Sequence, residues 1–352
     1  DKKINSPTNV IGGRVKVCFI LPEKAEDTAT HFAHKWELIQ ELKNDIDFMD
    51  SAYQPFGRGI FKIFFARFRG CKTYYVHYSF KGAIIARLAT VFGGKVFYWN
   101  CGMPWLYKRG WFEEWLFWNI LRHTILVIGT EKLAGEYAKR YGLDRKNIRV
   151  VPNYIRVSRV QQHSKVEMRK KLGIPLDKKV VLFLHRLSRR KGAHLLPEII
   201  KQFHNGDDVL FLVVGDGPER RTIEARITNY ELWEKTRLEG LIPNYKVPQY
   251  ITAADVYLMP SEEEGMPNAL LEAMAVGVPF VASNVGSVRE MTPPDLHEYT
   301  LPYGDTHAFV EKIKKLLADE ELCKRISVEE QEWVKQYDVS VVAPKYLELF
   351  LE

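Results

Sequence analysis

Cysteine is scarce in this 352-residue chain, which has only Cys18, Cys71, Cys101 and Cys323. No two of them form a Cys-x-x-Cys pair, which excludes a zinc knuckle and a dithiol redox motif and fits a reducing compartment. Apolar runs long enough to cross a bilayer are also absent. The N-terminal DKKINSPTN lacks the basic-then-apolar pattern of a secretory signal. We therefore expect a cytoplasmic location.

The composition is that of a folded globular protein. Hydrophobic residues make up 46% of the chain and charged residues 27%, which excludes a disordered or fibrous protein. A chain of 352 residues exceeds what one hydrophobic core usually supports. We therefore predict two domains.

Charge is distributed unevenly between the two halves. Residues 1–154 contain 24 Lys and Arg against 14 Asp and Glu, whereas residues 155–352 contain 27 against 30. The first half thus carries a net charge of +10 and the second −3. A cationic half indicates a polyanionic partner, either nucleic acid or an anionic membrane surface.

Short β-rich apolar runs alternate with helical patterns, which is typical of βαβ units and parallel sheets. In the first half we predict strands at 15–21, 73–76, 95–99 and 125–128, and helices at 32–42 and 81–92. In the second half we predict strands at 180–185, 209–214, 236–239, 256–259 and 279–282. The polar stretch 156–178 connects the two sheets. The fold class is therefore α/β.

A pair of glutamates follows the strand predicted at 256–259, in SEEEGMPNALLEAMAVGVPF at 261–280. Open α/β sheets bind ligands at the carboxyl ends of their strands. Pro267 indicates the first residue of a helix and Gly277 its end, so Glu264 lies in the preceding loop and Glu272 in the second turn. Free N–H groups at the helix start form an anion site, and flanking carboxylates suit sugar hydroxyls on either side of a diphosphate. More often, an isolated pair of glutamates of this kind only interacts favourably with the helix dipole or faces solvent.

A basic loop follows the strand predicted at 180–185. In this loop Arg186 and Lys191 can converge on a phosphate, Arg186 with its planar fork and Lys191 as a point charge. The next strand, in LFLVVGDGPE, ends at a turn that contains Gly215 and Gly217. Taken singly, both features are common in α/β proteins.

Together these segments resemble a known family. The order Arg-x4-Lys-Gly, Val-Gly-Asp-Gly-Pro-Glu, Ala-Asp-Val-Tyr-Leu-Met-Pro-Ser and Glu-x7-Glu is similar to the C-terminal domain of retaining glycosyltransferases of family 4, which have the GT-B fold. The resemblance covers residues 180–292. It implies two Rossmann-like, doubly wound domains facing a central cleft, at 1–155 and 156–335. It also implies a last helix at 336–352 that packs back on the first domain, and closure of the two domains on donor binding.

The resemblance implies a role for each motif residue. Arg186 and Lys191 would stabilise the leaving diphosphate, so that neither a metal ion nor another cofactor is expected. Glu264 would hold hydroxyls of the donor sugar, and Glu272 would bind the ribose of the nucleotide diphosphate sugar. Further donor contacts would come from Gly265, Met266, Pro267, Asn268, Ala269, Gly215 and Leu241. The enzyme would transfer a hexose-type sugar from a UDP- or GDP-sugar with retention of anomeric configuration.

The first half departs from the family pattern. Residues 22–30 lack the usual Gly-rich loop, although the N–H groups at 28–30 remain candidates to contact the diphosphate. Asn100 and Cys101 stand where family members commonly have a histidine near the reacting carbon. Together with His77, they are candidates for the acceptor or donor-sugar side of the cleft, although a lone histidine in such a turn is more often structural.

No metal site is predicted elsewhere in the first half. Asp45-Ile46-Asp47 resembles the Asp-x-Asp of metal-dependent enzymes, but it precedes a strand instead of ending one. We therefore predict a loop at these residues.

Two amphipathic segments of the first half, at 56–72 and 105–122, combine aromatic and basic side chains. At helical spacing the first has a basic face and the second a tryptophan stripe, formed by Arg58, Lys62 and Arg69, and by Trp111, Trp115 and Trp118. Such segments bind membrane interfaces, although aromatic residues also build cores. With the +10 charge, they predict peripheral association with the anionic inner face of the membrane and a glycan or polyprenyl-linked acceptor.

Three other interpretations stay open. The same chemistry on a soluble acceptor would need no membrane binding. A basic nucleic-acid-binding protein without catalysis would explain the charge but not the arrangement of Glu264 and Glu272. An epimerase of GT-B fold would need acid and base residues in the cleft that the sequence does not identify. We expect a glycosyltransferase without a nucleic-acid partner.

Overall fold

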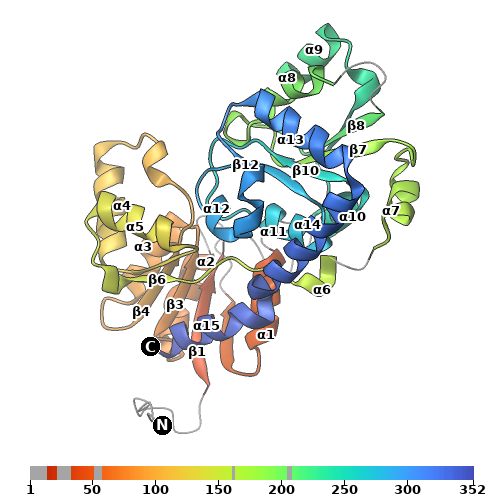
Figure 1. Ribbon diagram of the computed structural model, residues 1–352. Coiled ribbons are helices and arrows are strands. Elements are labelled where there is room, and N and C mark those ends of the chain that lie inside the picture. Colours follow the sequence, from red (N-terminus) through yellow and green to blue (C-terminus); the bar gives the residue numbers. More distant parts are fainter. Residues whose placement is uncertain (1–13, 22–32, 51–57, 161–162, 204–207) are drawn as a thin grey trace.

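The computed structural model describes residues 14–21, 33–50, 58–160, 163–203 and 208–352. Two lobes lie side by side in Figure 1, and each is built around a six-stranded sheet of parallel strands. The predicted α/β class with two Rossmann-like sheets is therefore confirmed. The residues at 28–30, predicted to contact a diphosphate, lie outside the described part of the chain.

The sheet of the first lobe has the strand order β2-β1-β3-β4-β5-β6. Its strands are β1 (Val15–Ile20), β2 (Ile46–Asp50), β3 (Thr73–His77), β4 (Lys95–Trp99), β5 (Ile125–Ile128) and β6 (Ile148–Val150). Val17 lies opposite Phe48 on one side and Thr73 on the other. The last four residues of β1 are all buried, as expected for a parallel sheet that is covered on both faces.

The helices of the first lobe are α1 (Ala33–Leu42), α2 (Arg58–Phe68), α3 (Phe80–Ala89), α4 (Trp111–Arg122) and α5 (Glu131–Tyr141). Side-chain caps set two of their starts. Ser79 accepts a hydrogen bond from the Gly82 N–H before α3, and Thr130 accepts one from the Leu133 N–H before α5. These caps fix the ends of the loops that follow β3 and β5, and both loops face the second lobe.

The sheet of the second lobe has the strand order β12-β11-β10-β7-β8-β9. Its strands are β7 (Lys179–Leu184), β8 (Val209–Val214), β9 (Thr236–Gly240), β10 (Val256–Met259), β11 (Phe280–Ser283) and β12 (Thr300–Leu301). The helices around it are α6 (Val157–Val160), α7 (Lys165–Leu172), α8 (Leu196–Lys201), α9 (Arg220–Asn229), α10 (Val247–Ala253), α11 (Asn268–Val276), α12 (Val288–Met291), α13 (Thr306–Ala318) and α14 (Glu320–Trp333). The strand order reverses between β7 and β10, so the loops that leave these two strands diverge and form a ligand-binding crevice.

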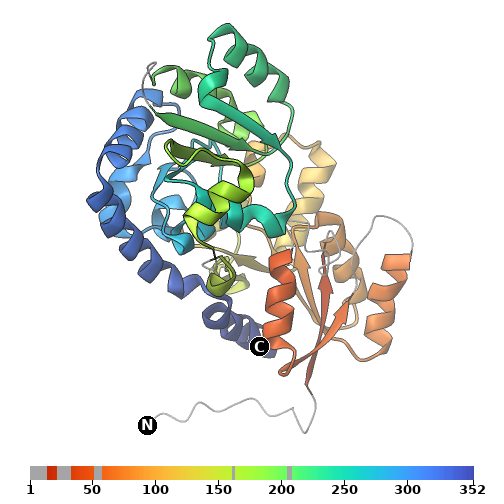
Figure 2. The same ribbon diagram turned by 90° about the vertical axis from the view of Figure 1, so that its right-hand side faces the viewer.

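The chain crosses between the lobes twice, and the two crossings lie side by side. Ile155 on the first crossing exchanges backbone hydrogen bonds with the second: its N–H donates to Tyr337 O at 3.0 Å and its carbonyl accepts from Val339 N at 2.8 Å. The last helix, α15 (Val339–Leu351), then packs against α1 and β1 of the first lobe, as Figures 1 and 2 both show. Tyr346 and Phe350 of α15 belong to the core of that lobe. The prediction that the last helix packs back on the first domain is confirmed.

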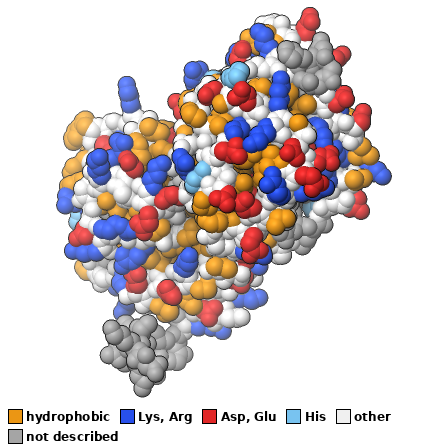
Figure 3. All heavy atoms as spheres, in the orientation of Figure 1, with side chains coloured by type: hydrophobic (Ala, Val, Ile, Leu, Met, Phe, Trp, Pro, Cys, Tyr) orange, Lys and Arg blue, Asp and Glu red, His pale blue; other side chains and the backbone are white. Residues whose placement is uncertain are grey.

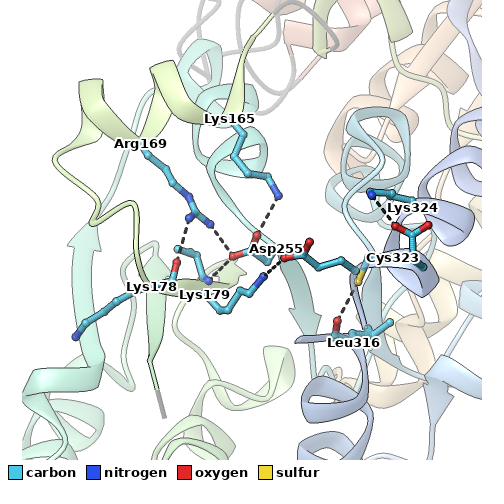
Figure 4. Close-up of polar contacts among 11 residues, drawn as sticks. Lys165, Arg169, Lys178, Lys179, Asp255, Leu316, Cys323 and Lys324 are labelled. Carbon is cyan, nitrogen blue, oxygen red and sulfur yellow. Dashed lines mark hydrogen bonds and ion pairs between the residues drawn. The ribbon is translucent and has the colours of Figure 1, made fainter. Parts of the chain in front are cut away.

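Asp255 ties the connecting helix α7 to the second sheet at the amino ends of its strands, away from the interlobe side. Its carboxylate accepts hydrogen bonds from Arg169 at 2.6 Å, Lys165 at 3.0 Å and the Val180 N–H at 2.6 Å (Figure 4). Burial alone would raise the pKa of Asp255, but these partners outweigh it and lower the pKa below its ordinary value. The connection after the first crossing is therefore fixed to the second lobe.

Three strands in the structure, β2, β6 and β12, are absent from the prediction. The prediction of a loop is wrong for Asp47, which pairs with Lys16 inside β2. The sequence of β2 is IDFMD, and acidic side chains are tolerated there because β2 is the edge strand of the sheet. The other predicted strands agree with the structure to within one or two residues, and the helix predicted at 81–92 ends earlier, at Ala89.

Candidate active site

A cavity of about 500 Å³ lies between the two lobes, at the carboxyl ends of strands from both sheets. Tyr78 and Trp99 line it from the first lobe, and His185 and Ala269 line it from the second. The second-lobe wall is formed by the loops that follow β7 and β10, where the strand order of the sheet reverses. This is the crevice in which open α/β sheets bind ligands.

Glu264 and Lys191 form a buried ion pair behind His185, which lines the cavity from the second lobe. Lys191 Nζ lies 2.8 Å from one carboxylate oxygen, and Ser261 Oγ donates to the other at 2.8 Å. Burial alone would raise the pKa of Glu264, but Lys191, His185 and Ser261 outweigh it and hold the pKa below its ordinary value. The loops after β7 and β10 thus bring together two of the three residues predicted to carry the chemistry, with the carboxylate ionised.

His185, directly after β7, is a cavity residue that the sequence analysis missed. Its Nδ1 accepts a hydrogen bond from the Arg186 N–H at 2.8 Å, which places the proton of the neutral ring on Nε2. Nε2 lies 3.5 Å from Glu264 Oε1. Burial lowers the pKa of His185 to about 4, so the ring is neutral at physiological pH. The signal in the sequence was its position at the end of a predicted strand, beside Arg186.

Glu272 lies in the second turn of α11, as predicted, and lines the cavity. Burial raises its pKa to about 7, with Arg159 acting in the opposite direction and Glu37 adding to the rise. Arg159 is engaged with Glu37 of α1, at 3.0 Å. No hydrogen bond or ion pair joins the Glu272 carboxylate to another described side chain, so it is available to a ligand.

The start of α11 faces the same cavity. Pro267, predicted as the first helical residue, is instead the cap, and Asn268 and Ala269 of the first turn line the cavity. The first N–H groups of a helix have no acceptor within it. Met266 contributes to the contact between the lobes, because its carbonyl accepts a hydrogen bond from Asn153 Nδ2 at 2.7 Å.

Two glycines allow close approach of backbones at this site. A Cβ on Gly265 would collide with the carbonyl of Cys101 in the other lobe, and a Cβ on Gly215 would collide with the carbonyl of His185. Gly215 also has a φ of 134°. Both glycines therefore permit close backbone contacts next to residues of the cavity.

The residues predicted on the first-lobe side are more deeply placed than expected. His77 lines the cavity but is almost fully buried, with its ring stacked on Trp99 at a centroid distance of 4.1 Å. Asn100 is buried and uses its amide within the loop, accepting from the Gly102 N–H at 3.1 Å. Cys101 is buried beside Gly265, and burial raises the pKa of its thiol to about 12. Contacts of these residues with a sugar remain a prediction.

Arg186 and Leu241 are both exposed. No hydrogen bond or ion pair of the Arg186 side chain is found among the described residues. Its predicted convergence with Lys191 on a phosphate remains a prediction. Leu241 directly follows β9, where we predict the nucleobase.

A contact between the lobes that the sequence analysis missed lies next to the Glu264 pair. Tyr107 of the first lobe donates its hydroxyl hydrogen to the buried carboxylate of Glu263, with the hydroxyl oxygen 3.0 and 3.1 Å from the two carboxylate oxygens. Arg190 lies 2.9 Å from the same carboxylate. Burial and Glu263 raise the pKa of Tyr107 to about 12. No local sequence pattern signals this contact, since Tyr107 and Glu263 are 156 residues apart.

The surface of the first lobe exposes large apolar side chains on α2 and α4. Phe68 is 86% exposed and Trp111 85%, and Phe61 and Trp115 are also exposed. Trp118 differs, since it packs on the core and donates to Tyr141 O at 3.1 Å. Lys62 and Arg69 are exposed on or beside α2, whereas the side chain of Arg58 lies outside the described set. Figure 3 shows Lys and Arg together with hydrophobic side chains on the outer surface of this lobe.

Within the described ranges, no group of three or more His, Cys, Asp and Glu side chains is arranged to hold a metal ion. None of the described helices is long and apolar enough to span a membrane.

Residues 164–333 match the family model described as "Glycosyl transferases group 1". Over 206 residues the chain is 30% identical to the 2-deoxystreptamine glucosyltransferase of Streptomyces kanamyceticus, covering 57% of this chain and 53% of that protein. Over 170 residues it is 35% identical to TuaC of Bacillus subtilis (strain 168), a protein named for teichuronic acid biosynthesis, covering 48% of this chain and 40% of that protein. The chain thus spans about half the length of these curated relatives.

Solved structures extend the likeness to the whole fold. Sucrose-phosphate synthase from Thermosynechococcus elongatus superposes with a TM-score of 0.79 at 20% identity, covering 96% of this chain and 98% of the other. HepE of Anabaena, in complex with UDP-glucose, superposes with a TM-score of 0.77 at 17% identity, covering 96% and 99%. The fold is therefore GT-B. The match to the glycosyl transferases group 1 model lies in the second lobe of this fold.

Proposed function

We propose that the protein is a retaining, metal-independent glycosyltransferase of family 4 type. It moves a hexose-type sugar from a UDP- or GDP-sugar to a glycan or lipid-linked acceptor at the cytoplasmic face of a membrane. The observation that carries the proposal is a pair of carboxylates at the cavity, with Glu272 on its lining and Glu264 directly behind His185. Glu264 is ionised and engaged beside Lys191, and Glu272 is open to the cavity on the other side of the α11 start.

The second-lobe wall offers a seat for each part of such a donor. The diphosphate lies at the start of α11, where free N–H groups and Lys191 face it. Lys191 has three N–H donors, and Glu264 and the Glu263 carbonyl occupy two of them, which leaves one for a phosphate oxygen. The donor sugar contacts Glu264, and the ribose hydroxyls donate to Glu272. The exposed side chain of Arg186 turns toward the diphosphate when the donor binds.

The transfer step needs only groups present in the complex. The bond from the anomeric carbon to the diphosphate oxygen breaks, and its electron pair leaves with the nucleoside diphosphate. An acceptor hydroxyl oxygen forms the new bond on the same face, and its proton passes to the departing diphosphate oxygen. Lys191 and Arg186 stabilise the charge that develops on the leaving group, which is where fixed cations contribute most to rate.

The relatives support this donor class. The Streptomyces kanamyceticus relative is named a glucosyltransferase, and HepE of Anabaena has been solved with UDP and with UDP-glucose.

A thermal-shift screen with UDP, GDP, ADP and their sugars tests the donor, because a bound nucleotide stabilises the folded protein by mass action. We expect one nucleotide and its sugars to raise Tm, and Glu272→Ala to reduce that shift. Transfer in the presence of EDTA tests metal independence. If no nucleotide sugar shifts Tm while nucleic acid binds with a steep salt dependence, the proposal is wrong and the binding-protein interpretation is favoured.

The exposed aromatic side chains on α2 and α4 support the membrane part of the proposal. Phe68 on α2 and Trp111 on α4 expose apolar surface, and Lys62 and Arg69 are exposed on or beside α2. Exposed aromatic and basic side chains together favour binding to anionic interfaces. We expect co-sedimentation with anionic liposomes at low salt, and its loss at moderate salt. Trp111→Ser with Trp115→Ser removes the binding but leaves transfer to a soluble acceptor intact. If the wild-type protein does not bind such liposomes at low salt, the result favours a soluble acceptor instead.

A further inference from the structure

Tyr78 has a backbone conformation that its residue type disfavours. Its φ is 58°, in the left-handed region, and Glu231 is the one other described non-glycine residue with positive φ. For a bulky side chain this conformation is unfavourable and persists only where the surroundings impose it. Glu231 follows the end of α9 on an exposed surface, where left-handed residues are common. Tyr78 instead lies between β3 and α3, at the cavity.

The surroundings of Tyr78 hold this conformation firmly. Its N–H donates to Trp99 O at 3.0 Å, and the next N–H, of Ser79, donates to His77 O at 2.7 Å. The Ser79 side chain caps α3 by accepting from Gly82 N at 3.0 Å. The chain therefore turns sharply at Tyr78, directly after a buried strand.

The result of this turn is an aromatic ring presented to the cleft. The Tyr78 ring meets Trp99 edge-on at 4.8 Å and His77 at 5.3 Å, yet the residue is 44% exposed and lines the cavity. His77 and Trp99 themselves are almost fully buried and serve as its support. Tyr78 also follows β3, which neighbours β1 where the strand order of the first sheet reverses. Ligands bind at such reversal points.

The charge of the surrounding wall limits the chemical class of ligand that can bind beside Tyr78. The described first-lobe residues that line the cavity include no Lys or Arg. Two arginines from the connection, Arg156 and Arg159, also line it, but they are engaged by Glu41 and Glu37. A phosphate or carboxylate on the ligand would therefore lack an unengaged cation from this wall. An aromatic ring with a hydroxyl suits a neutral sugar, whose C–H face packs on the ring while its hydroxyls hydrogen bond.

We propose that Tyr78 is the acceptor-positioning residue and that the acceptor unit carrying the attacking hydroxyl is an uncharged pyranose stacked on its ring. This inference rests on the proposed function, because it assigns the wall opposite the donor seat to the acceptor. It predicts that a bulky aromatic is retained at an unfavourable φ because the ring is needed for binding and not for folding.

Tyr78→Gly separates these two roles, since glycine adopts φ of 58° without strain. We expect Tyr78→Gly to raise Tm by a few degrees, to raise acceptor KM at least tenfold, and to leave nucleotide binding and donor hydrolysis unchanged. Tyr78→Phe keeps the ring, and acceptor KM should stay within about threefold. The matched control Glu231→Gly relieves the same strain and should raise Tm without changing acceptor KM.

Acceptor probes are octyl glycosides of neutral pyranoses, octyl glucuronide and octyl phosphate. Transfer to the neutral glycosides alone supports the proposal, and preferred transfer to octyl glucuronide or octyl phosphate overturns it. The proposal is also overturned if Tyr78→Gly has the acceptor KM of the wild-type protein. A lowered Tm together with loss of donor hydrolysis in this variant would overturn it as well, because Tyr78 would then have a structural role. Failure of the proposed function is distinct, because wild-type protein would then neither bind nor hydrolyse any nucleotide sugar.

Discussion

The two walls of the cavity differ in chemistry. On the second-lobe side, the groups behind the cavity lining are charged and engaged with each other, Lys191 with Glu264 and Arg190 with Glu263. The first-lobe wall is aromatic, with the exposed Tyr78 ring supported by the buried Trp99. Charged groups suit one defined ligand, whereas an aromatic surface accepts many ligands of one general shape. Under the proposed function, donor chemistry would be fixed in the second lobe and acceptor choice in the first.

The largest expected effect comes from breaking the charged wall at Lys191. Lys191→Ala removes the cation that faces the leaving group, and we expect turnover to fall by about 10²- to 10³-fold, as for loss of one stabilising donor in a preorganised site. Donor affinity should change much less. Turnover at saturating donor is the measurement, with the exposed Lys345→Ala as control. Wild-type turnover in Lys191→Ala would refute the assignment.

A second prediction concerns Lys35, which lies behind the aromatic wall. Lys35 is fully buried, its Nζ 4.8 Å from the Trp99 ring and 4.6 Å from the Tyr154 ring, and has no hydrogen-bond acceptor among the described residues. Burial lowers its pKa from 10.5 to about 7. Between these two pH values the unfolded chain binds the extra proton, so stability rises with pH by up to about 1.4 kcal/mol per pH unit.

Lys35→Met should remove this slope and stabilise the protein at pH 7.5 by about 1–3 kcal/mol, because a well-packed apolar side chain replaces a buried amine. Urea unfolding from pH 7 to pH 10 measures both effects. Lys345→Met, at an exposed position of α15, should leave the slope unchanged. An unaltered slope in Lys35→Met would show that the amine does not titrate in this range.

The pH dependence of nucleotide binding tests the role of Glu272 on the second-lobe side of the cavity. The folded-state pKa of Glu272 is raised to about 7, so the stability that its neutral form contributes is lost as pH rises through 7. Ribose hydroxyls need the ionised form as acceptor, so we expect nucleotide affinity to increase by up to about tenfold per pH unit below pH 7 and to level off above it. Glu272→Gln should bind more weakly at pH 8 and lose this dependence. Titration calorimetry from pH 5.5 to 8.5 is the test, with exposed Glu262→Gln as control.

The smallest expected effect comes from the hydrogen bond that joins the two lobes. Tyr107→Phe removes the hydroxyl that donates to Glu263, a hydrogen bond to a charged group worth about 1.5–3 kcal/mol at most. We expect a loss of up to about tenfold in kcat/KM for transfer, with nucleotide binding to the second lobe unchanged. Tyr230→Phe is a matched control, because Tyr230 donates to Glu198 at 2.7 Å within the second lobe. Equal effects of both variants would mean that the interlobe bond has no special role.

The parts of this molecule that the sequence predicted are those with local signals. The strands β4, β5, β8 and β10 match the predicted bounds because apolar runs are bounded by turn residues. Glu264, Lys191 and Glu272 follow strand ends or a helix start, and that position alone predicts the cavity. Edge strand β2 was missed because its alternating acids obscure the apolar run.

The first-lobe wall was less accessible to sequence reasoning. His77 has the residue type expected in a cleft, but the sharp turn after it presents Tyr78 instead, and a left-handed tyrosine has no sequence signature. Tyr107 and Glu263 meet only because the lobes fold against each other, so their contact is a tertiary property. The solvent exposure of a side chain also depends on tertiary structure, since Trp118 belongs to the same helical stripe as Trp111 yet packs on the core.

The paired crossings at Ile155 and Val339 have a mechanical consequence. Because the two chain segments are hydrogen-bonded to each other, they leave the lobes little freedom to slide or twist independently, and the remaining motion is a swing about one axis. The lobe that carries Tyr78 would then approach Glu264 along one path. Under the proposed function, acceptor and donor would meet in one relative orientation, so the backbone itself would constrain the stereochemistry and regiochemistry of the new bond.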